Sequence, residues 1–245
     1  MATEWCERFF GGLYADVLAS HGREESEAEA QLVKKLLRLD EGSRVLDLGC
    51  GMGRITLPLA HSGLDTTGVD LTARYIGRAR RRAEAEGVRA RFVQRDMRHI
   101  DFDGEFDAAF SWFTSFGYFP DRENLLTLKN ARKALRPGGR FLLEMHSKSF
   151  ILSHFRPHDE ATSGGVHVTE DRRYDARHST MRCVWTLTKG NTTETHRIAI
   201  KCYNGSEMRG LLRKAGFVNI RFYGRPPLGR FTRHSKRMIV VAEKP

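Results

Sequence analysis

The chain has 245 residues, of which 40% are hydrophobic, enough for one good-sized domain with a substantial core. No run approaches the roughly 20 apolar residues of a membrane span, and the acidic start of the chain lacks the basic-then-apolar order of a signal peptide. We therefore expect a cytoplasmic protein. Its four cysteines are far apart, which argues against disulfides and zinc, and we expect no metal site.

The net charge of +11 would suit a polyanionic partner. However, the basic residues are spread along the chain, and their densest run, residues 78–92, falls on a predicted helix whose charged face is most simply explained by solvation. We therefore regard a nucleic-acid partner as the weaker alternative.

The first 145 residues predict helices and strands in alternation. A helix at 24–38 begins with acids and ends with bases, as its dipole favours. Strands are predicted at 44–48, 65–70, 89–94, 106–111 and 138–145, separated by helices at 53–62, 72–87 and 122–135. Short apolar strands that alternate with helices indicate a doubly wound α/β fold with a parallel sheet.

From about residue 147 the pattern changes. Three extended segments, at 167–175, 179–188 and 194–203, predict an antiparallel β insertion that spans 147–203. The α/β pattern then resumes with a helix at 206–216, which we expect Ser206 to cap, and with strands at 217–224 and 236–244. We expect a single domain over 1–245.

A glycine-rich turn follows the first predicted strand, in the sequence RVLDLGCGMGR. Gly49, Gly51 and Gly53 are not spaced as in the dinucleotide fingerprint G-x-G-x-x-G, which would place its third glycine at Arg54. In addition, Asp47 would repel a pyrophosphate but could bind an ammonium group. The ligand is therefore better described as a nucleoside that carries an amino acid.

Two further acids follow the next two strands. Asp70 can accept hydrogen bonds from both hydroxyls of a ribose. Asp96 can accept from the amino group of adenine, and Met97 can cover the ring. Because parallel strands end at one edge of a sheet, Asp47, Asp70 and Asp96 should lie close together.

This ordered set resembles the class I S-adenosylmethionine-dependent methyltransferases. The resemblance extends over nearly the whole chain through VLDLGCGMG, GVDLT, RDM, FDAAFSWFTSFGYF, LRPGGRFLLEM and EMRGLLRKAGF. It implies a Rossmann-like, seven-stranded, mostly parallel sheet with an antiparallel last strand. It also implies binding of S-adenosyl-L-methionine, with S-adenosyl-L-homocysteine as product, by Asp47, Gly49, Gly51, Asp70, Leu71, Asp96, Met97, Ser111 and Trp112.

Two aromatic stretches are the candidates for the acceptor pocket. In similar enzymes a segment such as residues 1–23 folds over the cofactor as a lid, which would place Tyr14 near the sulfonium or the methionine carboxylate as a cofactor-binding and catalytic residue. The other stretch is SWFTSFGYF at 111–119. Simple packing is the alternative for the proposed acceptor-binding residues Phe9, Phe10, Phe113, Phe116 and Tyr118.

His146, which follows a predicted strand, is the candidate base, and a solvent-facing or merely hydrogen-bonded histidine is the alternative. The stretch SWFT replaces the N-P-P-Y signature of many base methyltransferases. The resemblance is to bacterial small-molecule enzymes, and it implies transfer of a methyl group to nitrogen or oxygen of a small metabolite in antibiotic or secondary metabolism. The alternatives are an RNA or protein methyltransferase and a cofactor-binding protein without activity. The insertion would cover the acceptor pocket or join two subunits of a homo-oligomer.

Overall fold

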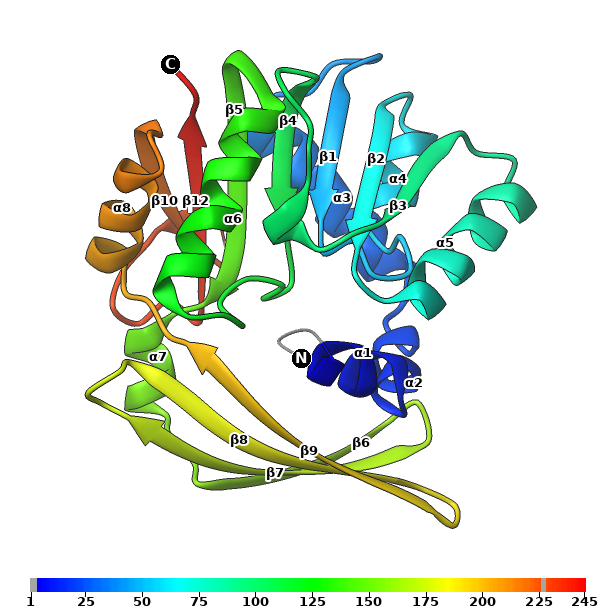
Figure 1. Cartoon of the computed structure of the whole chain (residues 1–245), viewed down its shortest axis with the longest axis vertical. Helices are drawn as coiled ribbons and strands as arrows, with labels where there is room; N and C mark the ends of the chain where they lie inside the picture. The colour runs from blue at the N-terminus through cyan, green and yellow to red at the C-terminus, as the bar shows by residue number, and fades with distance from the viewer. Residues whose placement is uncertain (1–3, 226–227) are drawn as a thin grey trace.

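A computed structural model describes residues 4–225 and 228–245 (Figure 1). Its main sheet has the strand order β11-β10-β12-β5-β4-β1-β2-β3. The parallel strands are β1 (Arg44–Leu48), β2 (Asp65–Asp70), β3 (Ala90–Gln94), β4 (Phe106–Ser111) and β5 (Leu135–His146). The last strand, β12 (Arg237–Glu243), is antiparallel to both of its neighbours, β5 and β10 (Val218–Arg225). This confirms the predicted mostly parallel sheet, to which β11 (Gly229–Arg230) adds a short eighth strand.

Helices cover both faces of this sheet (Figure 1). On one face, α6 (Asp121–Ala134) and α8 (Gly205–Lys214) bury apolar side chains against the strands. On the other face, α3 (Arg23–Leu37) and α4 (Thr56–His61) do the same, while α5 (Ala73–Ala85) packs against β2 and β3. The core therefore consists of two apolar layers that hold the sheet rigid beneath its loops.

Helix α8 begins earlier than we predicted. The side chain of Asn204 accepts a hydrogen bond from the Glu207 backbone N–H (2.9 Å), and the Glu207 side chain accepts one from the Asn204 N–H (2.8 Å). This reciprocal pair is a capping box. The assignment of Ser206 as the cap was wrong, because Ser206 lies inside the first turn.

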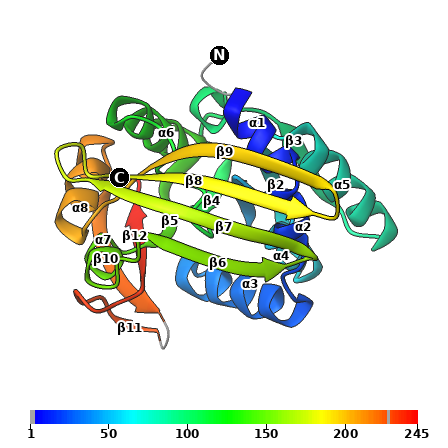
Figure 2. The same ribbon diagram turned by 90° about the horizontal axis from the view of Figure 1, so that it is seen from below.

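The insertion between β5 and α8 forms a separate antiparallel sheet, which we call the cap sheet (Figure 2). After α7 (Lys148–Ser153) come β6 (His158–Ser163), β7 (Val166–Asp175), β8 (Thr180–Lys189) and β9 (Thr192–Lys201), paired in that order. We predicted three of these strands and missed β6, an edge strand whose side chains are mostly exposed. The insertion ends where it began, since the Lys148 N–H donates to the Tyr203 carbonyl (3.2 Å).

Two short helices near the start of the chain, α1 (Glu4–Gly11) and α2 (Tyr14–Ala19), lie between the main sheet and the cap sheet (Figure 1). The Leu13 N–H donates to Glu194 of β9 (3.0 Å), and Lys189 of β8 forms an ion pair with Asp16 (2.8 Å). These helices are therefore attached to the cap sheet by polar contacts. Among the described residues, no helix is both long and apolar enough to span a membrane.

Candidate cofactor and acceptor site

A cavity lies at the carboxyl ends of β1, β2 and β3 and extends under α1 and α2. The turn after β1 forms its floor. Gly49 has φ +78°, and a Cβ there would lie 2.6 Å from the Cβ of Ser115, so only glycine fits against the loop after β4. Gly51, with φ +55°, borders open space, since a Cβ there would meet nothing within 4 Å. The backbone at Gly51 can therefore be approached closely by a ligand.

Asp47 is buried at the end of β1 and is only 4% exposed. Burial raises the pKa of its carboxyl to about 7, although the hydrogen bond from the Thr56 hydroxyl (2.7 Å) acts against the rise. The nearby charge of Asp70 raises the pKa further, and that of Arg54 lowers it. A buried acid in this state would gain from a cationic ligand.

Asp70, at the end of β2, accepts hydrogen bonds from the backbone N–H groups of Gly51 (2.9 Å) and Thr72 (2.8 Å). Burial raises its pKa, and these two bonds partly offset the rise. They hold the carboxylate against the glycine turn. Leu71 follows it in the cavity wall.

Asp96 caps the short helix η1 (Met97–His99) by accepting from the Arg98 N–H (2.8 Å). Burial alone would raise its pKa, but the Arg98 side chain, 2.6 Å away, and the backbone bond outweigh burial and hold the pKa below its usual value. Asp96 therefore stays ionised. With Met97 it lines the same cavity as Asp47 and Asp70, so the structure brings the three acids together.

Our sequence analysis did not identify Arg54, at the other end of the cavity, or Glu29, which lies behind the cavity wall. Arg54 lines the cavity, with Nη1 2.6 Å from Oε2 of Glu29 on α3. Glu29 also accepts a hydrogen bond from Nε1 of Trp112 (3.0 Å), and Trp112 lines the cavity. The sequence contains one hint of this pairing: Glu29 is an acid on the otherwise largely apolar face of the helix.

The roof of the cavity comes from α1 and α2. Phe10 and Tyr14 line it, whereas Phe9 does not, because its ring stacks on Tyr14 at 4.4 Å and packs against the cap sheet. Burial raises the pKa of Tyr14 to about 12, so its hydroxyl keeps its proton. Phe9 therefore supports the roof from behind and does not form part of the cavity surface.

The aromatic stretch at 111–119 also contains some residues that line the cavity and others that do not. Phe113, which is 38% exposed, and Tyr118 line the cavity. Ser111 and Phe116 are buried and do not belong to its lining, and Phe116 packs into the main core. The structure thus places these two predicted residues behind the cavity wall.

The candidate base, His146, is not among the residues that line the cavity. It is half-buried at the end of β5, where burial and then the charges of Arg237, Lys236 and Arg172 lower its pKa to about 3. His146 is therefore neutral at ordinary pH, and it does not form part of the cavity wall.

Three polar atoms in the cavity wall are buried without a hydrogen-bond partner among the described residues: the Tyr75 hydroxyl, the Thr114 hydroxyl and Nη2 of Arg54. Buried polar groups are seldom left unpaired. A ligand with a carboxylate and hydroxyl groups would satisfy them, while Asp47 and Asp70 would accept from an ammonium and a ribose. The wall therefore fits an amino-acid-bearing nucleoside. Among the described residues, no group of His, Cys, Asp and Glu side chains could hold a metal ion.

Residues 45–139 match the family described as "Methyltransferase domain". A segment of 119 residues is 35% identical to a protein of Bacillus subtilis (strain 168) that is named as the methyltransferase YqeM. The matching segment covers 48% of this chain and 48% of YqeM. The chain spans about half the length of the curated relatives that it matches first.

Solved structures resemble the chain over its whole length. The methyltransferase CcbJ from Streptomyces caelestis has a TM-score of 0.81 at 18% identity, covering 100% of this chain and 99% of its own. CalS10 from Micromonospora echinaspora, an amino pentose methyltransferase solved with S-adenosylmethionine bound, has a TM-score of 0.64 at 20% identity, covering 97% of both chains. Residues 45–139 therefore resemble a methyltransferase domain, and the chain as a whole has the α/β Rossmann-like fold of the methyltransferases that it resembles.

Proposed function

We propose that the protein uses S-adenosyl-L-methionine to methylate an amine of a small metabolite. The observation that carries this proposal is that a polar wall and an aromatic wall face the same cavity. One wall holds Asp47, Asp70 and Arg54, and the other consists of aromatic side chains supplied by α1, α2 and the loop after β4.

The polar wall would bind the cofactor by complementary charge. Arg54 Nη2 would donate to the methionine carboxylate, Asp47 would accept from the ammonium, and Asp70 would accept from the ribose hydroxyls. Charge-assisted hydrogen bonds of this kind contribute roughly 1.5–3 kcal/mol each. Asp96 and Met97 would hold the adenine.

The cofactor supplies a methyl group that is already activated on a sulfonium. The protein must therefore align the acceptor and exclude water, which in favourable cases contributes ~7–11 kcal/mol. Phe10, Tyr14 and Tyr118 form the part of the wall suited to this, and aromatic faces attract a positive centre by ~0.5–2 kcal/mol.

The residues around the cavity favour nitrogen over oxygen as the methylated atom. Among the described residues of its wall there is no histidine, and Asp47, Asp70 and Asp96 are already bound to donors from the protein. A neutral amine attacks without a base, whereas an alcohol needs one. The similarity to CalS10, whose acceptor is an amino pentose, supports an amine.

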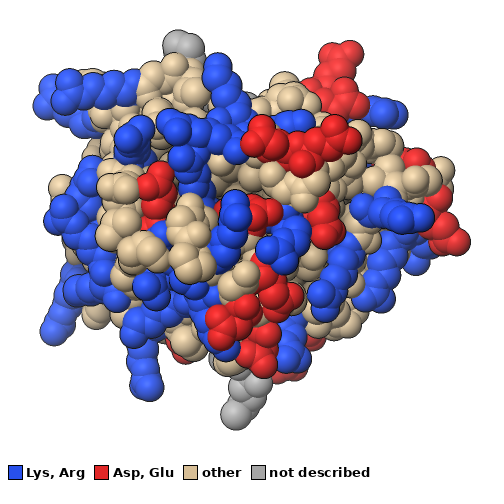
Figure 3. Space-filling model, turned by 90° about the horizontal axis from the view of Figure 1, so that it is seen from above, with Lys and Arg blue, Asp and Glu red and all other residues tan. Residues whose placement is uncertain are grey.

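A methyltransferase acting on RNA is the second candidate, favoured by the net charge of +11. Figure 3 shows Lys and Arg side chains scattered over the face away from the cap sheet, with Asp and Glu among them. A continuous basic track would support RNA binding better. RNA binding that falls steeply with salt would favour this candidate.

Calorimetry with S-adenosyl-L-homocysteine tests the proposed cofactor. We expect the wild-type protein to bind it and Asp70→Asn to bind it about tenfold or more weakly, because the ribose loses a charged acceptor. Asp65→Asn, at the exposed start of the same strand, is the matched control. Pairs of amino sugars and their hydroxyl analogues, followed by mass spectrometry, then test the acceptor atom. Methylation of only the hydroxyl analogues would contradict the amine.

A further inference from the structure

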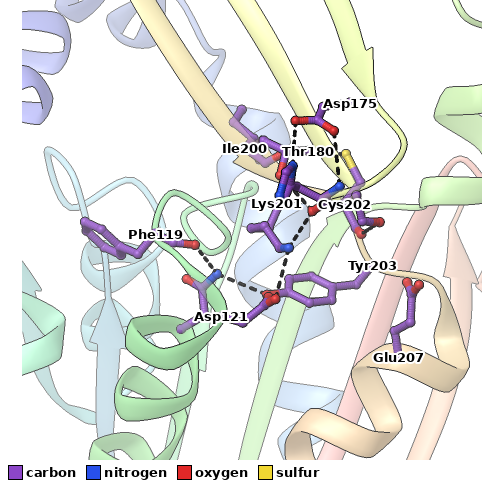
Figure 4. Close-up of polar contacts among 12 residues, drawn as sticks. Phe119, Asp121, Asp175, Thr180, Ile200, Lys201, Cys202, Tyr203 and Glu207 are labelled. Atoms are coloured by element: carbon purple, nitrogen blue, oxygen red, sulfur yellow. Dashed lines mark hydrogen bonds and ion pairs between the residues drawn. The ribbon is translucent and has the colours of Figure 1, made fainter.

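Three side chains meet where the cap sheet returns to the main domain, and we call them the clasp: Asp121, Lys201 and Tyr203. Lys201, the last residue of β9, places its Nζ 3.0 Å from Oδ2 of Asp121, the first residue of α6. The Tyr203 hydroxyl donates to Oδ1 of Asp121 (2.8 Å). Figure 4 shows Lys201 and Tyr203 converging on Asp121.

Lys201 and Tyr203 are shielded from water, whereas the side chain of Asp121 is 60% exposed. Tyr203 is 6% exposed and the side chain of Lys201 15% exposed. Burial raises the pKa of Tyr203, and its hydrogen bond to Asp121 raises it further, so the hydroxyl remains a donor. The Lys201 N–H adds a backbone bond to the Gly117 carbonyl (2.8 Å). The end of β9 is thus fixed to both the loop after β4 and α6.

A chain of contacts leads from the clasp to the cofactor cavity. Asn124, fully buried, donates from Nδ2 to the Tyr203 hydroxyl (3.1 Å) and to the Phe119 carbonyl (2.6 Å). The centroid of the Phe119 ring lies 3.9 Å from the guanidinium carbon of Arg98, and Arg98 forms the ion pair with Asp96. Phe119 and Asp96 both line the cavity, whereas no clasp residue does.

The cap sheet also carries the roof. Its strands bind the α1–α2 segment through Glu194 and Lys189, and that segment supplies Phe10 and Tyr14 to the cavity wall. A shift of the cap sheet relative to the main domain would therefore change the cavity both at Phe119 and at the roof.

We propose that Asp121, Lys201 and Tyr203 are positioning residues that couple the docking of the cap sheet to cofactor binding. This inference rests on the proposed cofactor. The clasp fixes the cap sheet and the Phe119 segment in the arrangement that binds the nucleoside. Because coupling is reciprocal, an acceptor that binds beneath the cap sheet and stabilises its docking tightens cofactor binding by the same factor.

The test measures S-adenosyl-L-homocysteine affinity by calorimetry in Asp121→Asn and Lys201→Met. We expect the affinity to fall about threefold to tenfold, although neither residue touches the cavity. Lys201→Arg, which keeps the charge, should bind nearly as well as wild type. Lys133→Met is the matched control, because it removes an ion pair of the same length (3.0 Å, to Asp101) from the same helix, away from the cap sheet.

A double-mutant cycle separates positioning from general loosening. Phe119→Leu removes the contact with Arg98, so its effect and that of Asp121→Asn should be less than additive if both act through one chain of contacts. Hydrogen exchange should show faster amide exchange at 117–121 in the bound Asp121→Asn variant, and circular dichroism checks that each variant folds.

Two failures are distinguishable. Wild-type affinity in both Asp121→Asn and Lys201→Met, or fully additive losses with Phe119→Leu, would overturn the clasp and leave the proposed function standing. Absence of binding by the wild-type protein would overturn the proposed function and the clasp with it.

Discussion

Oε2 of Glu29 lies 2.6 Å from Nη1 of Arg54, and this ion pair joins α3 to the turn that follows β1. The side chain of Glu29 is 3% exposed and that of Arg54 is 19% exposed. Because Glu29 also accepts from Trp112, one buried carboxylate holds two side chains of the cavity wall in place. Under the proposed function, Glu29 therefore orients residues that would bind the methionine moiety.

Replacing Glu29 with Gln should destabilise the protein. Breaking a buried ion pair by removing one charge costs roughly 3–5 kcal/mol, and since Arg54 retains some exposure we expect about 3 kcal/mol less free energy of unfolding, measured by urea denaturation. Glu27→Gln is the control on the same helix. Its pair with Arg23 is exposed, so the urea midpoint should not change. Equal effects of both variants would contradict the role of Glu29.

Gly51→Ala should damage ligand binding more than it damages the fold. The positive φ makes any L-residue strained by ~1–2 kcal/mol, and the added methyl group would enter the open space above the turn. Gly42→Ala also places an L-residue at positive φ (+79°) where a Cβ meets nothing within 4 Å. Both variants should lose similar stability, but only Gly51→Ala should lose affinity for S-adenosyl-L-homocysteine in calorimetry.

Asp47 should make cofactor binding depend on pH. Its pKa is raised to about 7, so below that pH it is protonated and must lose a proton to bind an ammonium. Affinity for S-adenosyl-L-homocysteine should rise by up to about tenfold per pH unit towards pH 7 and then level off. Calorimetry near pH 6 in buffers of different ionisation enthalpy should detect the released proton.

The stability of the free protein should change in the opposite direction. A raised pKa favours the protonated acid in the folded state, so this contribution is complete below the unfolded pKa of 3.8 and is lost as the pH rises through about 7. Asp47→Asn should remove the part of each dependence that is centred near pH 7. A pH-independent affinity in the wild-type protein would contradict an ionised Asp47 in the complex.

His146→Ala should leave turnover within about twofold of wild type, because His146 does not line the cavity and a pKa of about 3 makes it a weak base. A positioned general base contributes ~10²–10⁴-fold. Turnover that falls about a hundredfold, in a variant with unchanged melting temperature, would identify His146 as the base after all.

The glycine turn and the acids could be located from the sequence because each depends on local rules. Gly49 and Gly51 need positive φ. Asp47 and Asp70 lie at the ends of β1 and β2, and Asp96 follows β3, so the order of the strands fixes a common edge. The main sheet could also be predicted, because the alternation of helices and strands is likewise a local pattern. The pattern therefore identified one side of the cavity.

The other side depends on contacts between distant segments, which a local pattern cannot show. Glu29 meets Trp112 across 83 positions, and Tyr203 meets Asp121 across 82. Strand β6 was missed because HDEATS lacks the apolar alternation of a half-buried strand. Its place at the sheet edge comes from pairing with β7 and not from its own residues.

The hydrogen bond between the Lys148 N–H and the Tyr203 carbonyl shows that the chain leaves the main domain and rejoins it at one spot. An insert with adjoining ends can be exchanged by recombination without moving the framework around it. Chimeras with crossovers at these two points would acquire a new cap while keeping the glycine turn and its three acids, provided that the new insert retains the contacts made by Lys189, Glu194 and Lys201. Under the proposed function, such an exchange would change the preferred acceptor while the cofactor stays the same.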